Sequence, residues 1–251
     1  MRIAELAWSI LFWNTEMREP MRVKPERFKE WNEAMVRKYD PDAFHHHPNP
    51  FVRLIEGKRV KSILRLMDIR CEDDHILEIG CGAGNVLEQV HRGNLWGIDI
   101  SASILGKAKQ KLSKQVTLLQ ADAQSLPFKD QAFKQLICSE VLEHLLEPLA
   151  SLGEMARILN RGGVAVVSVP NELWINRIKR TLIRLRVFDL FFCRKGGYER
   201  MPENMEDEWH LHAYPIGEWL ALFSKSFRVS CVERIPFFWL PLRHIIRLER
   251  K

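Results

Sequence analysis

The sequence predicts an α/β protein with a mostly parallel sheet between layers of helices. From residue 75 onward, short apolar runs alternate with helical stretches, which is the pattern of repeated β-α-β units. The chain has 251 residues, of which 46% are hydrophobic and 28% charged, so one α/β domain with an appendage can bury a large core. Strands are expected at 75–80, 95–100, 116–122, 133–139, 164–169 and near 227–235.

Helices are expected between these strands and before the first one. Ser101 is a suitable N-cap for a helix over 101–112. Pro148 lies in the first turn of a helix over 148–159, with glycines just beyond its end. Further helices are expected at 26–38, 51–67, 84–91 and near 216–223, and a proline-rich loop at 39–50.

The first 60 residues are expected to form an N-terminal helical extension or lid, and residues 61–251 the main domain with an insertion at 171–212. Ile3–Trp13 favours an amphipathic helix over a signal peptide, because charge interrupts it and no small-residue cleavage site follows. Translation from Met1 and from Met21 both fit. No apolar run approaches the roughly 20 residues that span a bilayer.

Charge and cysteine content narrow the surroundings of the protein. The net charge of +6 and the pI of about 9.1 permit an anionic partner without selecting one. Five scattered cysteines without a C-x-x-C pair indicate neither a disulfide framework nor a zinc knuckle. A reduced, cytoplasmic compartment is therefore expected.

A glycine-rich loop follows the first strand of the alternating region. Gly80, Gly82 and Gly84 would lie at the carboxyl edge of a parallel sheet, where glycine lets a ligand approach the backbone closely. The dinucleotide pattern G-x-G-x-x-G fails, because its third position falls on Asn85 or Leu87. Asp99 closes the next strand, where a carboxylate can accept hydrogen bonds from ribose hydroxyls. An adenosyl cofactor is therefore expected.

Together, several segments resemble class I S-adenosylmethionine-dependent methyltransferases. The resemblance is strongest to those of ubiquinone biosynthesis and to other small-molecule or lipid-intermediate types. The likeness covers roughly residues 60–235 and implies a Rossmann-like three-layer sandwich with a mostly parallel seven-stranded sheet. The segments are E-x-G-x-G-x-G at 78–84, D-A-x-x-L-P-F at 122–128, S-E-V-L-E-H-L at 139–145 and the helix exit at 156–163.

The resemblance implies S-adenosyl-L-methionine as the cofactor. Glu78 would serve its α-ammonium group, directly or through water. Asp122 would accept from the adenine amine, beside the backbone N–H of Ala123. The expected cofactor-binding residues are Glu78, Gly80, Cys81, Gly82, Gly84, Asp99, Ile100, Asp122, Ala123, Ser139 and Glu140.

Methyl transfer needs an aligned acceptor and, for an oxygen acceptor, a base. His144, near the expected methyl group, and His210 with His212, on one side of an extended segment, are the candidate catalytic residues. His144 could instead cap or pack the next helix. O-methylation of a small-molecule or lipid-like acceptor is the favoured activity, although the core also supports nitrogen and carbon acceptors. The alternatives are a non-catalytic module that binds a membrane or protein partner, and a nucleotide-dependent oxidoreductase.

His45, His46 and His47 favour a lid loop over a metal site, since consecutive residues rarely face one ion. No metal site is therefore expected, although a joint site with His210 and His212 stays open.

The insertion carries a basic-apolar stretch over 174–195. A lid over the acceptor and a contact with a membrane surface both fit this amphipathic pattern, so the protein is expected to be cytoplasmic or peripheral at a membrane. A nucleic-acid substrate is disfavoured, because Ser139–Leu142 replaces the N/D-P-P-Y/F segment. The apolar face would hold Trp174, Ile178, Leu182, Leu185, Phe188 and Phe192, and the basic face Arg177, Arg180 and Arg184.

Overall fold

A seven-stranded sheet forms the middle layer of the protein. The computed structural model describes residues 23–69, 71–113, 115–186 and 209–251. The strand order is β3-β2-β1-β4-β5-β7-β6, with β1 to β5 parallel and β7 antiparallel to both β5 and β6. The predicted mostly parallel α/β fold is confirmed. The strands are β1 His75–Ile79, β2 Asn94–Asp99, β3 Thr117–Gln120, β4 Phe133–Ser139, β5 Leu159–Pro170, β6 Phe227–Phe237 and β7 Leu240–Arg250.

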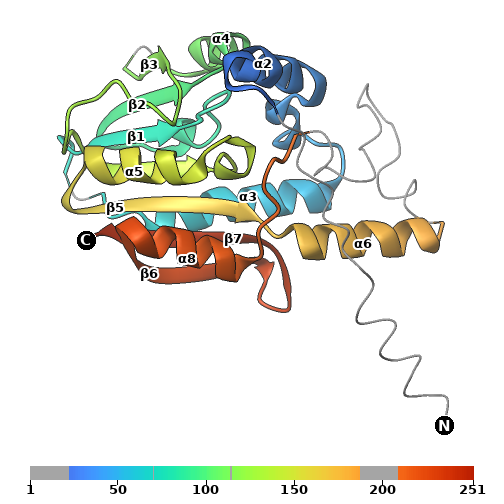
Figure 1. Ribbon diagram of the computed structural model, residues 1–251. Coiled ribbons are helices and arrows are strands. Elements are labelled where there is room, and N and C mark those ends of the chain that lie inside the picture. The colour runs from blue at the N-terminus through green and yellow to red at the C-terminus, as the bar shows by residue number, and fades with distance from the viewer. Residues whose placement is uncertain (1–22, 70, 114, 187–208) are drawn as a thin grey trace.

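Helices cover both faces of the sheet. Figure 1 shows α5 (Pro148–Ile158) and α8 (Ile216–Ser226) in front of the sheet and α3 (Pro50–Leu66) behind it. The front layer buries Leu152 and Phe223, and the back layer buries Ile63. The remaining helices are α2 Phe28–Tyr39, α4 Ala102–Lys111 and α6 Glu172–Arg184, with 3-10 turns at Pro25–Arg27, Pro41–Phe44, Leu87–Gln89 and Leu142–His144.

Side-chain caps fix where two of these helices begin. The Ser101 hydroxyl accepts a hydrogen bond from the backbone N–H of Ile104 at 3.4 Å, as expected for the N-cap of α4. The Asn49 side chain accepts from Phe51 N at 2.8 Å, and Pro50 occupies the first helical position of α3. Because α3 continues to Leu66, the expected division at residue 60 falls inside this helix.

The helix predicted over 84–91 is wrong: this segment forms only the turn at Leu87–Gln89. Its backbone bonds are mostly of the short i to i+3 type, such as Val90 N to Leu87 O at 3.0 Å. Leu87 packs against Leu105 while Val90 packs against the α3 layer. A longer helix would not place these side chains in two separate clusters.

The C-terminal segment forms a hairpin that the sequence analysis did not locate. Strand β7 pairs with β5 and β6, and Ile245, Ile246 and Leu248 are buried in the core. Phe238 and Trp239 lie at the turn of the hairpin and are exposed. Residues 235–244 therefore form the end of β6, the hairpin turn and the start of the inner strand β7.

The burial of α6 matches the predicted faces only in part. The basic face with Arg177, Arg180 and Arg184 is exposed, and Trp174, Ile178 and Leu182 on the apolar face are half-buried. The buried residues of α6 are polar: Glu172, Asn176 and Lys179. Leu173 and Leu185, by contrast, are 60% and 63% exposed. These polar residues are buried because this side of α6 lies on a cavity, where Glu172 pairs with His210.

Some expectations fall outside the described residues. These are the N-terminal helix over 3–13, the start at Met21, and Phe188 and Phe192 on the expected apolar face.

A buried glutamine joins α3 to the sheet. Gln135 in β4 is fully buried, donates to Asp68 O at 2.7 Å and accepts from Asp68 N at 3.2 Å. We expect Gln135→Leu to lower the free energy of unfolding by about 2 kcal/mol, because both backbone groups lose their partner. Gln110→Leu, on the exposed side of α4, should change it by less than about 0.5 kcal/mol. Urea denaturation measures both, and equal effects would contradict this role.

Candidate active site

A cavity of about 350 Å³ opens at the carboxyl ends of β1 to β4. Ligands bind at this edge in open α/β sheets, where the strand order reverses on either side of β1. The cavity brings together most of the residues that the sequence singled out; Gly84 and His212 do not line it. The predicted residues that do are Glu78, Gly80, Cys81, Gly82, Asp99, Ile100, Asp122, Ala123, Ser139, Glu140, His144 and His210.

The three glycines of the loop have different roles. All have positive φ angles, of 67° at Gly80, 52° at Gly82 and 80° at Gly84. A Cβ on Gly80 or Gly84 would lie within 2.5 Å of Val141 or Leu112. At Gly82 the nearest atom would be 4.0 Å away. Gly82 therefore offers bare backbone to open space in the cavity, as a closely approaching ligand requires.

Asp99 ties the glycine loop to the end of β2. Its carboxylate accepts from Gly82 N and from Ser101 N, both at 2.9 Å. Burial raises the pKa of Asp99. A carboxylate has about four lone-pair sites, so Asp99 retains acceptor capacity for a ligand.

Asp122 and Ala123 border the same cavity after β3. Asp122 Oδ1 accepts from Gln124 N at 2.8 Å in a tight turn. This turn holds the Asp122 carboxylate and the buried Ala123 at the cavity wall.

Glu78 is a buried carboxylate with an orphaned oxygen. Its residue is 2% exposed, and among the described residues Oε2 has no hydrogen-bond partner. Burial raises the pKa of Glu78 to about 8, against the opposing charge of Arg59. Such a group is costly unless a ligand supplies a cation or donor, and the α-ammonium group of S-adenosylmethionine fits this requirement.

Arg59 borders the site beside His45 and was not predicted from the sequence. Arg59 in α3 is buried, donates to Glu56 at 2.8 Å and to Ser139 Oγ, and lies 3.2 Å from His45 Nε2. Burial and the charge of Arg59 lower the pKa of His45 to about 4. The available signal was the Glu56–Arg59 pair, which is spaced i,i+3 and falls on the helical face that also carries Ile63. His45 and His47 line the cavity, which agrees with the expected lid loop.

Glu140 is engaged by the protein itself. Its carboxylate accepts from Ser168 Oγ at 2.8 Å and pairs with Arg243 Nε at 2.6 Å. The Ser139 hydroxyl lies 2.8 Å from Ser168 Oγ. These two expected cofactor residues therefore border the cavity with their polar groups already paired.

His144 presents one free nitrogen. Its Nδ1 donates to the carbonyl oxygen of Trp209 at 3.1 Å, and its ring stacks on Trp209 at 4.6 Å. This leaves the Nε2 lone pair of the neutral ring available. Burial lowers the pKa of His144 well below its usual value, so the neutral form is present at neutral pH.

His210 and His212 diverge, contrary to the expectation that they share one side. His210 lines the cavity with Nδ1 2.5 Å from Glu172 Oε1. The Nε2 of His212 lies 2.9 Å from Leu145 O, outside the cavity. Burial alone would raise the pKa of Glu172, but the hydrogen bond from His210 helps to lower it.

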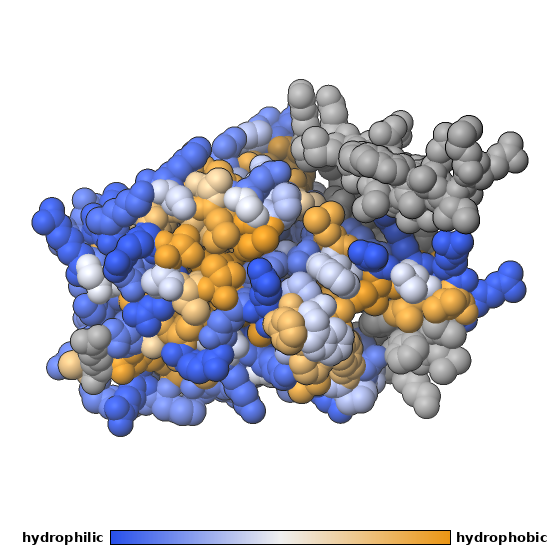
Figure 2. All heavy atoms as spheres, turned by 90° about the horizontal axis from the view of Figure 1, so that it is seen from below, coloured by the Kyte–Doolittle hydropathy of each residue, from blue (hydrophilic) through white to orange (hydrophobic). Residues whose placement is uncertain are grey.

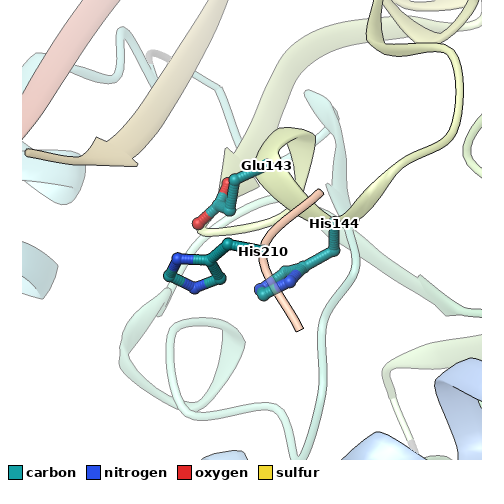
Figure 3. Close-up of side chains that lie close together, drawn as sticks. All are labelled: Glu143, His144 and His210. Atoms are coloured by element: carbon teal, nitrogen blue, oxygen red, sulfur yellow. The ribbon is translucent and has the colours of Figure 1, made fainter. Parts of the chain in front are cut away.

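Glu143, His144 and His210 gather at one end of the cavity, and Figure 3 shows their side chains turned toward one another. One potential ligand atom from each lies within 4.8 Å of the others. Among the described residues, this is the group with the donor types of a metal site.

Residues 77–167 match the family model described as "Methyltransferase domain". The chain is 34% identical to an uncharacterized Methanocaldococcus jannaschii protein, covering 61% of this chain and 64% of that one. It is 33% identical to a ubiquinone/menaquinone biosynthesis C-methyltransferase of Campylobacter jejuni, covering 43% and 50%. The chain thus spans less than two thirds of the length of these curated relatives.

Solved structures share the fold at low sequence identity. A Thermotoga maritima S-adenosylmethionine-dependent methyltransferase, described as a possible histamine N-methyltransferase, has a TM-score of 0.59 and 18% identity, covering 89% of this chain and 100% of that chain. A Methanosarcina mazei S-adenosylmethionine-dependent methyltransferase has a TM-score of 0.54 and 21% identity, covering 75% and 96%. These likenesses establish the Rossmann-like methyltransferase fold.

The open space beside Gly82 generates a prediction. Gly82→Ala should weaken binding of S-adenosylhomocysteine by at least about 10-fold, because the new methyl group enters the cavity, with about 1 kcal/mol of backbone strain. Gly106→Ala, in α4 with nothing near its Cβ, should leave the affinity unchanged and stabilise the helix. Calorimetric titration measures both, and an unchanged affinity for Gly82→Ala would place the ligand elsewhere.

Glu78 generates a second prediction. Its pKa of about 8 keeps it mostly protonated at neutral pH, and a bound ammonium group favours the ionised form. Binding of S-adenosylhomocysteine near pH 7 should therefore release close to one proton. Titrations in buffers of different ionisation enthalpy measure this release, and Glu78→Gln should abolish it. Equal release by wild type and variant would exclude Glu78 as its source.

Proposed function

We propose that this chain, which carries the methyltransferase domain of the class I S-adenosylmethionine-dependent family, transfers a methyl group from S-adenosyl-L-methionine to a small-molecule acceptor. The observation that carries the proposal is the orphaned Glu78 carboxylate beside the bare backbone of Gly82, in a cavity at the carboxyl edge of the sheet. The unpaired Glu78 oxygen costs stability without a ligand, and both features match this cofactor.

Each residue around the cofactor has a proposed role. Glu78 binds the α-ammonium group, and Arg59, whose charge acts on Glu78, binds the neighbouring carboxylate. Asp99 accepts from the ribose hydroxyls, and Asp122 accepts from the adenine amine. The bound cofactor supplies an electrophilic methyl group on a sulfonium centre.

The acceptor end of the cavity provides a base. His144 is neutral, and its Nδ1 bond to Trp209 orients the ring with Nε2 free. A neutral imidazole can take a proton from the acceptor as the new bond forms. His210, oriented by Glu172, is the second candidate.

The expected O-methylation of a lipid-like acceptor remains a proposal. A named relative from Campylobacter jejuni is a C-methyltransferase. In that relative the acceptor atom is carbon, whereas oxygen was expected here. Buried charges at the acceptor end, such as Glu143 and Lys179, favour an acceptor with a polar or charged group. They do not favour a wholly apolar one.

A contact with a membrane surface remains part of the proposal. Exposed Leu173 and Leu185 on α6, and Phe238 and Trp239 on the β6–β7 hairpin, are apolar groups at the surface. Figure 2 shows hydrophobic patches among hydrophilic residues on the face seen from below. Arg177, Arg180 and Arg184 supply positive charge on the same helix, which suits anionic headgroups. Within the described ranges, no helix has the length and apolar character needed to cross a bilayer.

Calorimetric titration with S-adenosylmethionine and S-adenosylhomocysteine tests the function. We expect wild type to bind both and Asp99→Ala to lose about 100-fold in affinity, because buried hydrogen bonds to a charged group are worth about 1.5–3 kcal/mol each. Asp73→Ala, at an exposed position, is the matched control. Failure of wild type to bind either ligand would end the proposal, and binding of NAD instead would favour an oxidoreductase.

A further inference from the structure

The described lining of the cavity has more carboxyl groups than permanently cationic side chains. It includes seven carboxyl groups and three permanent cations. S-adenosylmethionine, with a sulfonium, an ammonium and a carboxylate, brings a net charge of +1 and offsets only part of this excess. The remaining imbalance favours a positively charged second ligand. The carboxyl groups are Glu56, Glu78, Asp99, Asp122, Glu140, Glu143 and Glu172, and the cations are Arg59, Lys179 and Arg243.

Three of these carboxylates at the acceptor end already have partners. Glu56 pairs with Arg59 at 2.8 Å. Glu140 pairs with Arg243 at 2.6 Å. Glu172 lies 2.5 Å from His210, and the charge of Lys179 contributes to lowering its pKa.

The carboxylates on the cofactor side also have an assignment. Asp99 and Asp122 accept backbone N–H groups and retain lone pairs for the ribose and adenine. Glu78 is assigned to the cofactor ammonium group. This elimination leaves Glu143 without a counterpart.

The Glu143 side chain is deeply buried. It is 1% exposed, and among the described residues neither carboxylate oxygen has a hydrogen-bond partner. Its backbone carbonyl is used, because it accepts from Leu211 N at 2.8 Å and His212 N at 3.0 Å. The fold therefore holds Glu143 firmly, while its side chain points toward His144 and His210 (Figure 3). Burial of such an acceptor costs several kcal/mol unless a ligand satisfies it.

The spacing of the cluster is compatible with an ammonium group. Ligand atoms around a tetrahedral metal at about 2.1 Å lie roughly 3.4 Å apart. Acceptors around an ammonium nitrogen, with hydrogen bonds of about 2.9 Å, lie roughly 4.7 Å apart. The atoms of Glu143, His144 and His210 lie within 4.8 Å of one another. Acceptors within this limit can all reach one ammonium nitrogen, and the test below distinguishes an ammonium group from a metal ion.

We propose that the acceptor is an amine and that Glu143 binds its ammonium group beside His144 and His210. This inference rests on the proposed methyltransferase function. The ammonium group gives one proton to Nε2 of neutral His144, which frees the nitrogen lone pair. The nitrogen–methyl bond then forms as the sulfur–methyl bond of the cofactor breaks. The products are a methylated ammonium group and S-adenosylhomocysteine, and the proton on His144 passes to solvent.

Binding of matched amines and alcohols to protein saturated with S-adenosylhomocysteine tests this assignment. The pairs are benzylamine with benzyl alcohol, phenethylamine with phenethyl alcohol, and putrescine with butanediol. For at least one pair we expect the amine to bind at least about 10-fold tighter, as for a charge-assisted hydrogen bond in a buried site. That amine should also accept labelled methyl from S-adenosylmethionine.

Glu143→Gln should remove the preference for the amine and leave the affinity for S-adenosylhomocysteine unchanged. It should also unfold at a higher temperature than ligand-free wild type, because an unpaired buried carboxyl group is removed. His212→Gln, outside the cavity, should keep the preference. If Glu143→Gln does not fold, Glu143→Met serves in its place.

Three results would overturn the assignment. One is the absence of an amine preference in all pairs. Another is a preference that survives in the Glu143 variant. The third is binding of Zn²⁺ or Mn²⁺ that depends on Glu143 without any amine preference, which would make the cluster a metal site. The separate titration with S-adenosylhomocysteine distinguishes each of these from failure of the methyltransferase proposal itself.

Discussion

Burial of carboxylates without counter-ions at one edge of the sheet is the constraint on which the rest of the structure depends. Glu78 and Glu143 are both at most 2% exposed, and each has an oxygen without a hydrogen-bond partner among the described residues. Burial raises the pKa of both groups, and because the pKa of Glu78 is raised to about 8, the chain without ligand is expected to hold Glu78 mostly protonated at neutral pH. This arrangement lowers the free energy of unfolding, and the loss is offset only when cationic ligands bind. The pairing of these buried carboxyl groups with the cofactor and the acceptor therefore contributes to the affinity for both ligands.

The groups that organise this edge come from elements outside the familiar strand-and-loop core. Arg59 in α3 holds Glu56 and Ser139, and Arg243 in β7 holds Glu140. These pairs fix the Glu56 and Glu140 carboxylates in place. A polar face of α6 closes the same end. The acceptor region is thus assembled from three separate parts of the chain, and its charge pattern exists only in the folded protein.

The sequence was sufficient for the parallel core and most of the cavity lining, and insufficient for the acceptor end. The core was predictable because each motif follows a buried parallel strand, and these strand ends meet at one edge. Arg59 and Arg243 could not be found this way, because they lie on a helix and a late strand without local motifs. The buried polar residues of α6 were not predicted, because amphipathic periodicity assumes that the inner positions of a helix are apolar. His212 was grouped with His210 because alternation in an extended segment was assumed, whereas His212 is held by Leu145 O. The turn at Leu87–Gln89 shows a similar limit, since apolar residues at helical spacing serve two separate clusters there.

A crystal structure with S-adenosylhomocysteine bound tests the central claim most directly. The account places the ligand's ammonium group within hydrogen-bond distance of Glu78, its ribose on Asp99 and its sulfur facing the space between Gly82 and His144. It also leaves Glu143 accessible from that space. A ligand bound outside this cavity, or a bound state in which Glu78 remains without a partner, would contradict the account.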